Sequence, residues 1–177
     1  MRFVIVQTFV VASALLAGAS NTGACEFVYI SLDGENRIAV YSVDESSGEL
    51  TAVANVKTPS PPGGLTSDPK NRFLYASLRR AGKLASFRIN QDGGLTLINV
   101  VAAGADPAYV ATDRTGRFLL TAYYVAAKVA VHQIGKDGSI SEKPLQEIAT
   151  DTKAHAIMMD ASNRFAFVPH TGPNAIY

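Results

Sequence analysis

The sequence is poor in cysteine and in net charge. Its 177 residues contain one cysteine, Cys25, so no disulfide can form within the chain. The formal net charge is +1, and without Arg2, which belongs to the leader segment described below, basic and acidic residues are equal in number. With no basic run either, this balance argues against a nucleic acid or an anionic membrane surface as partner.

Motifs for metal, phosphate and nucleophilic chemistry are missing too. The sequence has no cysteine cluster, no histidine pair at metal-ligating spacing, no glycine-rich phosphate loop and no nucleophile elbow. Beyond residue 25 it has neither a helical period nor an apolar stretch long enough to span a bilayer. We therefore expect no metal, no cofactor and no membrane span.

Residues 1–24 have the features of a signal peptide. Arg2 precedes a mostly apolar stretch, and small residues allow cleavage after Ala19 or Ala24. We exclude this segment from the fold and predict export to the periplasm or the extracellular space. Lipid anchoring at Cys25 is the alternative, although the aliphatic residue usual three places before such a cysteine is absent.

The rest of the chain repeats one motif at regular intervals. Asp-x-x-Asn/Gly-Arg-Phe begins at Asp68, Asp113 and Asp160, which lie 45 and then 47 residues apart. Each copy reads as three short β-strands, separated by turns in which Asp-Gly and Gly-Gly pairs tolerate positive φ angles. The predicted strands are residues 27–32, 37–43 and 50–56, residues 73–78, 83–89 and 95–101, and residues 118–124, 128–134 and 140–148.

A fourth predicted strand leads into each repeated Asp, at residues 64–67, 108–111 and 155–158. Its small side chains suit the innermost strand of a propeller blade. Four antiparallel strands per roughly 46 residues predict an all-β fold, a β-propeller. The predicted blades begin near Phe27, Phe73, Phe118 and Phe165.

Residues 25–177 supply about 3.3 such blades, fewer than the roughly four to eight that close a ring. The first copy also lacks an inner strand of its own. We therefore interpret residues 25–177 as a partial propeller, the N-terminal part of a longer one, in which a C-terminal segment would complete the first blade.

The repeat separates scaffold from candidate site. Residues present in every copy are predicted to be structural, the carboxylates capping backbone N–H groups of the turns and the arginines bracing the loops. They are Asp68, Asp113 and Asp160, and Arg72, Arg117 and Arg164.

His155 departs from the repeat. Five residues before each repeated Asp the chain has Gly63, Ala108 and His155. At the entrance of an inner strand, this imidazole would face the mouth of the central channel and could serve as general acid or base near neutral pH. His155 is the predicted catalytic residue, and a histidine hydrogen-bonded within its loop is the alternative.

The other two histidines carry weaker predictions. His170 ends a predicted strand beside the turn at residues 171–174, and is a candidate substrate-binding residue in the same mouth. A turn-bonding role is its alternative. His132 falls in the middle of a predicted strand, which indicates a packing role.

With the blades aligned, the sequence resembles the seven-bladed propeller lactonase family, which includes bacterial 6-phosphogluconolactonase and fungal carboxymuconate cyclase. The resemblance covers the chain after the leader. It is carried by VYI at residues 28–30, SGELT at 47–51, SDPKNRFLYAS at 67–77 and AHAIMMDASNRFAFVPHTGPNAI at 154–176.

The resemblance implies a site in the channel mouth built from one His, two Arg and a Glu. His155 falls on the family's His, whereas the two Arg and the Glu belong to later blades and have no counterpart here. This chain also has Ala122 where relatives commonly carry an Asn before the Tyr.

Together these observations predict an exported, 6-phosphogluconolactonase-like enzyme that hydrolyses a sugar-type lactone, its small-molecule partner, by His-assisted attack of water. A carboxymuconate cyclase-like cycloisomerase is one alternative, and a non-catalytic propeller that binds protein or saccharide is another. A signal peptide is unexpected in an enzyme whose substrate is a cytoplasmic sugar phosphate. Whether the substrate carries a phosphate is therefore left open. Residues 25–177 alone are expected to be inactive.

Overall fold

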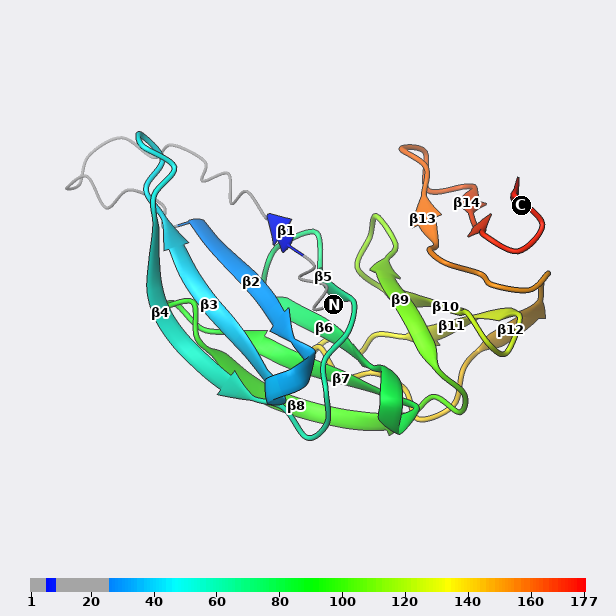
Figure 1. Ribbon diagram of the computed structural model, residues 1–177, viewed down its shortest axis with the longest axis horizontal. Coiled ribbons are helices and arrows are strands. Elements are labelled where there is room, and N and C mark those ends of the chain that lie inside the picture. Colours follow the sequence, from blue (N-terminus) through cyan, green and yellow to red (C-terminus); the bar gives the residue numbers. More distant parts are fainter. Residues whose placement is uncertain (1–5, 9–25) are drawn as a thin grey trace.

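The computed structural model describes residues 6–8 and 26–177, and it confirms the all-β, propeller-type fold. Three four-stranded and two two-stranded antiparallel sheets follow one another in chain order, as the colours in Figure 1 help to trace. The predicted signal segment and Cys25 lie outside the described residues, apart from Val6–Thr8.

The first three sheets each have four strands. The first consists of β1 (Val6–Thr8), β2 (Glu26–Leu32), β3 (Arg37–Val43) and β4 (Leu50–Lys57). The second consists of β5 (Leu65–Ser67), β6 (Phe73–Leu78), β7 (Lys83–Ile89) and β8 (Leu95–Ala102). The third consists of β9 (Pro107–Thr112), β10 (Phe118–Tyr123), β11 (Lys128–Gln133) and β12 (Gln146–Ala149).

The fourth blade is made of shorter pieces. β13 (Met158–Met159) pairs with β14 (Ala166–Phe167), and β15 (Pro169–His170) pairs with β16 (Ala175–Ile176). Two single 3₁₀ turns, η1 (Asp33–Glu35) and η2 (Arg79–Ala81), connect the second and third strands of the first two blades. Within residues 6–8 and 26–177 no helix is long and apolar enough to cross a membrane.

β1 takes a place that the repeat did not predict. It pairs antiparallel with β2 through Val6↔Ile30, Gln7↔Tyr29 and Thr8↔Val28. In the second and third blades the equivalent edge is occupied by β5 and β9, the inner strands. The first blade therefore has a fourth strand drawn from within the predicted leader, where we expected one from a later segment.

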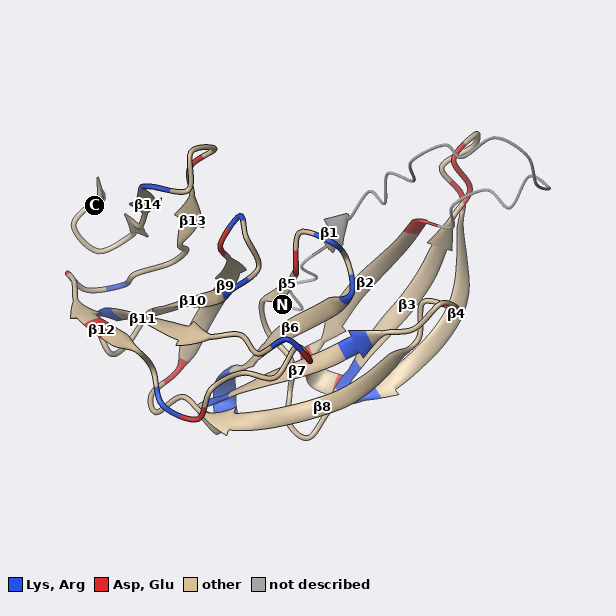
Figure 2. Cartoon of the chain, turned by 180° about the vertical axis from the view of Figure 1, so that it is seen from behind, with Lys and Arg blue, Asp and Glu red and all other residues tan. Residues whose placement is uncertain are grey.

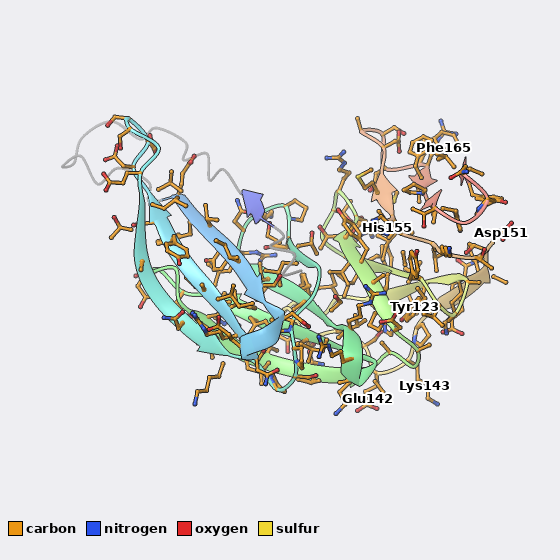
Figure 3. The ribbon with its side chains drawn as sticks, viewed as in Figure 1. Tyr123, Glu142, Lys143, Asp151, His155 and Phe165 are labelled. Carbon is orange, nitrogen blue, oxygen red and sulfur yellow. The ribbon has the colours of Figure 1, made fainter. Side chains whose placement is uncertain are left out.

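The predicted strand at residues 140–148 is wrong over most of its length. Ile140 forms an isolated bridge with Ile134, and regular pairing resumes only at β12. Pro144 has no N–H to give to the ladder, and the charged Glu142 and Lys143 before it are exposed. Figure 3 labels these two residues at the lower edge of the molecule.

The hydrophobic core lies between the blades. β6 is buried along its whole length because alternate side chains face opposite neighbours. Leu74, Ala76 and Leu78 belong to the cluster shared with the first blade, whereas Phe73 and Tyr75 belong to the cluster shared with the third. A third cluster joins the third blade to the fourth through Leu120, Ala122, Val129, Ala154, Ile157 and Val168. The second and third blades are thus stabilised by a blade on either side, and the first and fourth by the one described blade next to each of them.

The repeated Asp residues cap their turns as predicted. In each loop one carboxylate oxygen accepts two backbone N–H bonds, from the residues four and five positions later, at distances between 2.6 and 3.0 Å. The following guanidinium lies over the next ring, 5.0 Å from the centroid of Phe73 in the second blade. The same stacking joins Arg117 to Phe118 and Arg164 to Phe165.

Apolar side chains remain exposed on the fourth blade. They are Met158, Phe165, Phe167, Ile176 and Tyr177, each at least 48% accessible. Charged residues are spread over the molecule, with Lys and Arg interspersed among Asp and Glu in Figure 2. Phe165, labelled in Figure 3, shows the contrast: it is 58% exposed, whereas its repeat equivalent Phe73 is 3% exposed beneath the third blade.

Glycine in the turn after β11 allows the blades to pack, and we expect Gly138→Ala to destabilise the protein. At φ +90° an added Cβ would overlap the Phe73 ring, so the Phe must move. Gly104→Ala is the matched control, because Gly104 has φ +80° but open space around it. We expect Gly138→Ala to cost about 1–3 kcal/mol more than Gly104→Ala in denaturant unfolding of the full-length protein. Equal costs would show that the Phe73 contact is unimportant.

The turn carboxylates should make the stability acid-sensitive. Burial by itself would raise the pKa of Asp113, but hydrogen bonds from Thr115, Phe118 and Asn163 outweigh it and lower that pKa. The folded protein then binds fewer protons than the unfolded chain, so this stabilisation is present above the unfolded pKa of about 4 and is lost as the pH falls below it.

Asp113→Asn should therefore destabilise the protein at pH 7 and flatten the fall in its unfolding free energy between pH 5 and 3. Urea titrations at several pH values measure both effects. Glu45→Gln, at an exposed position in the turn after β3, is the control and should keep the wild-type slope. An unchanged acid slope in Asp113→Asn would contradict the assignment.

Candidate functional site

His155 lies on the segment that leads into β13, as Figure 3 shows, with its side chain exposed. Its N–H donates to the carbonyl of Pro169 at 2.9 Å, and the preceding Ala154 forms a bridge with His170. The last blade therefore fixes the backbone of His155 while leaving the imidazole accessible.

The predicted inner strand at residues 155–158 is shorter than expected, because only Met158 and Met159 form regular pairs. The repeat gives the physical reason. In the second blade the Ser77 N–H donates to Gly64 O at 2.9 Å, whereas the equivalent position in the fourth blade is Pro169, which has no N–H. His155 thus stands on an extended segment before the strand.

Tyr124 is the aromatic neighbour of His155. Their ring centroids are 5.9 Å apart at an interplanar angle of 70°, an edge-to-face arrangement. Tyr124 follows the last residue of β10, and its hydroxyl accepts a hydrogen bond from the Thr171 hydroxyl at 3.3 Å. The third and fourth blades thus meet at this ring.

Arg79 and Asp106 form an ion pair next to Tyr124. Arg79 Nε and Nη2 lie 2.6 and 2.8 Å from the two carboxylate oxygens of Asp106, a bidentate geometry. The Arg79 guanidinium carbon lies 5.8 Å from the Tyr124 ring centroid. The hydrogen bond to Asp106 raises the pKa of Arg79, against a smaller lowering by burial. A second ion pair, Arg80 with Asp33 at 2.6 Å, links the first two blades nearby.

Lys153 has an unusual backbone conformation two residues before His155. Its φ is +60°, a left-handed geometry that costs a residue with a side chain roughly 1–2 kcal/mol. Two hydrogen bonds hold it: its N–H donates to Tyr124 O at 3.1 Å, and its carbonyl accepts from Thr171 N–H at 3.2 Å. The loop that presents His155 is therefore held in place by both neighbouring loops.

The other histidines are buried. His170 is 3% exposed, Nδ1 lies 2.9 Å from Val168 O, and the ring makes an edge-to-face contact with Tyr177 at 4.7 Å. The backbone of His170 thus lies near that of His155 in space, but the His170 imidazole is enclosed by the fourth blade. His132 is 1% exposed in β11 with Nδ1 3.0 Å from Ser141 O, which confirms its packing role.

A cavity of about 440 Å³ lies at the other end of the inner strands. Its polar lining includes Asp68, Asp113 and Arg114. The carboxylates serve the turns described above, and the Arg114 guanidinium donates to the carbonyls of Met159 and Asp160. The polar groups of this cavity therefore hold neighbouring blades together. Within the described ranges, no group of three or more His, Cys, Asp or Glu is arranged to hold a metal ion.

The arrangement around His155 can perform proton transfer. An accessible imidazole stands before β13, a tyrosine ring packs against it, and a guanidinium lies beyond that ring. The sequence analysis selected His155 as a candidate, but it did not select Tyr124, Arg79 and Asp106, which the structure places next to it in a row.

A signal for the missed residues was present in the sequence. Six residues after the first Phe of each blade, the repeat has Asp33, Arg79, Tyr124 and Thr171, and seven residues before each repeated Asp it has Pro61, Asp106 and Lys153. Both positions vary from blade to blade, as the His155 position does. The same test of departure from the repeat would have selected them.

Comparison with known proteins agrees with this architecture. The family model described as Lactonase, 7-bladed beta-propeller, matches residues 33–177. The 6-phosphogluconolactonase of Bacillus subtilis (strain 168) is 40% identical over 69 residues, which cover 38% of this chain and 20% of that protein.

Solved structures show the same fold. A protein from Lactobacillus plantarum superimposes with a TM-score of 0.77 at 18% identity, over 83% of this chain and 46% of its own. The periplasmic gluconolactonase of Pseudomonas aeruginosa superimposes with a TM-score of 0.66 at 22% identity, over 72% of this chain and 38% of its own. The chain spans less than half the length of each of these three relatives. With the family model matching most of its residues and the blades in place, the chain belongs to the seven-bladed β-propeller lactonase family.

Proposed function

We propose that the protein hydrolyses a sugar-type lactone and that His155 is its general base. The observation that carries the proposal is the placement of an accessible imidazole at the one inner-strand entrance where the repeat departs from Gly and Ala. Membership of the lactonase family and the similarity to a 6-phosphogluconolactonase support the choice of a lactone as substrate.

In the proposed reaction, His155 removes a proton from a water molecule as its oxygen attacks the lactone carbonyl carbon. The tetrahedral intermediate collapses by breaking the ring C–O bond, and the protonated imidazole returns its proton to the departing ring oxygen. The product is an open-chain hydroxy acid. Arginines that the family carries on later blades would stabilise the oxyanion.

A cycloisomerase would use the same histidine differently, transferring a proton to or from carbon and releasing no hydroxy acid. A non-catalytic propeller would convert neither a lactone nor a muconate. Product analysis by NMR on lactone and on muconate substrates therefore separates the three functions.

We also propose that the protein acts after export. The support is the sequence of residues 1–24, with its basic start, apolar stretch and small residues at the cleavage positions. An exported enzyme favours a lactone without phosphate over a cytoplasmic sugar phosphate. On this proposal, glucono-δ-lactone is opened at least as efficiently as its 6-phosphate.

His155→Ala in the full-length protein should lower kcat for lactone opening by about 10²- to 10⁴-fold, because the general base is lost. The rate is measured by acid release, with the spontaneous hydrolysis subtracted. Thr152→Ala, an exposed change in the same loop, is the control and should keep the wild-type rate. A His155→Ala variant as fast as wild type would show that another group activates the water.

A further inference from the structure

We propose that Tyr124 is a positioning residue for His155 and that the Arg79–Asp106 ion pair holds Tyr124 in place. The proposal deepens the function above and depends on it only for the role of His155 in the reaction. The contacts that carry it link Asp106 to Arg79, Arg79 to Tyr124, and Tyr124 to His155. Together they connect the second, third and fourth blades.

The His155 side chain needs an external partner to hold one orientation. It is exposed, and in the part of the chain that the structure describes its imidazole makes no hydrogen bond. Backbone bonds fix the Cα of His155 but leave its two side-chain torsions free. The edge-to-face contact with Tyr124 is the interaction that restricts them.

Tyr124 itself is held at three points. Its carbonyl accepts the N–H of Lys153 at 3.1 Å, its hydroxyl accepts from Thr171 at 3.3 Å, and its ring lies beside the Arg79 guanidinium. A guanidinium within about 6 Å of an aromatic centroid is attracted to the ring. Tyr124 is also half-buried, so it has less freedom than His155 and can serve as its support.

Asp106 determines where the Arg79 guanidinium lies. The two short bonds between Arg79 and Asp106 form a bidentate pair, a geometry that restricts the orientation of the guanidinium. Asp106 comes from the loop before β9, whereas Arg79 begins η2 after β6. The pair therefore ties two blades together directly beside the Tyr124 ring.

The repeat shows that this set of contacts is particular to one junction. Arg79 and Tyr124 occupy the same repeat position in neighbouring blades, and Asp106 and Lys153 share another. At the junction between the third and fourth blades, the residues at these two positions are joined by a backbone hydrogen bond from Lys153 to Tyr124, in place of an ion pair. Such a one-off arrangement, ending on the candidate base, fits a role in the site better than a role in the scaffold, whose contacts recur in each blade.

Tyr124→Leu tests the proposal, with Tyr124→Phe as the conservative variant, in the full-length protein. Because Leu removes the ring, we expect kcat for lactone opening to fall about 10-fold with KM within twofold of wild type, since imprecise placement of a catalytic group slows the chemical step. Tyr124→Phe keeps the ring and should retain most of the rate. Asp106→Asn should give a smaller loss of kcat, about 3-fold, through a looser Arg79.

Asp33→Asn is the matched control, because it breaks the neighbouring ion pair with Arg80, whereas the guanidinium over the Tyr124 ring is that of Arg79. It should keep the wild-type kcat. A readout independent of catalysis is the His155 Cε1–H signal in NMR, assigned by its loss in His155→Ala. The shift that the ring at position 124 induces in this His155 signal should persist in Tyr124→Phe and Asp33→Asn, and disappear in Tyr124→Leu.

The outcomes separate this proposal from the proposed function. If His155→Ala is inactive while Tyr124→Leu keeps both the wild-type kcat and the wild-type position of the His155 signal, the positioning role is wrong. If His155→Ala stays active, the general-base assignment fails, and the NMR shift alone then decides the contact. Equal losses in Tyr124→Phe and Tyr124→Leu would assign the effect to the hydroxyl and overturn the proposal. Should Tyr124→Leu not fold, Asp106→Asn against Asp33→Asn decides it.

Discussion

The two hydrogen bonds that one aspartate oxygen accepts from successive backbone N–H groups fix the first turn of the second, third and fourth blades. They reverse the chain between the inner strand and the second strand, at Asp68, Asp113 and Asp160 alike. The reversal places an arginine and a phenylalanine next in the chain, where the guanidinium covers the ring. Phe73 then packs against the glycine turn of the following blade. One local capping interaction thereby sets both the strand register and the contact with the neighbouring blade.

Because the core lies between sheets, stability and site formation depend on the same interfaces. Each of the three hydrophobic clusters draws side chains from two blades, so no single sheet has a core of its own. Repeat proteins are stabilised in this way by contacts between neighbours. The loops around Tyr124 are consequently held in position by packing between the blades, and the ion pair of Arg79 with Asp106 adds a direct link between two of them.

The sequence predicted the repeating features well because they are local. Strand ranges in the second blade, the capping aspartates and the glycines at positive φ follow from residue type and spacing. The failures arose where a proline removes a donor from the ladder, at Pro144 and at Pro169. Tyr124 was missed for a different reason. Its proposed role rests on contacts with Arg79 and His155, which belong to other blades and become neighbours only when the sheets pack.

A repeating frame explains why the proposed site consists of exceptions to the repeat. The recurring residues must satisfy the same turns and interfaces in every blade, so they leave little freedom for chemistry. Other positions can differ from one blade to the next, as His155 differs from Gly63 and Ala108. The frame nevertheless fixes where their Cα atoms stand. In the proposed positioning role, a tyrosine one blade before the histidine, with an ion-paired arginine before that, uses the fixed spacing of the blades to give a single imidazole a defined orientation.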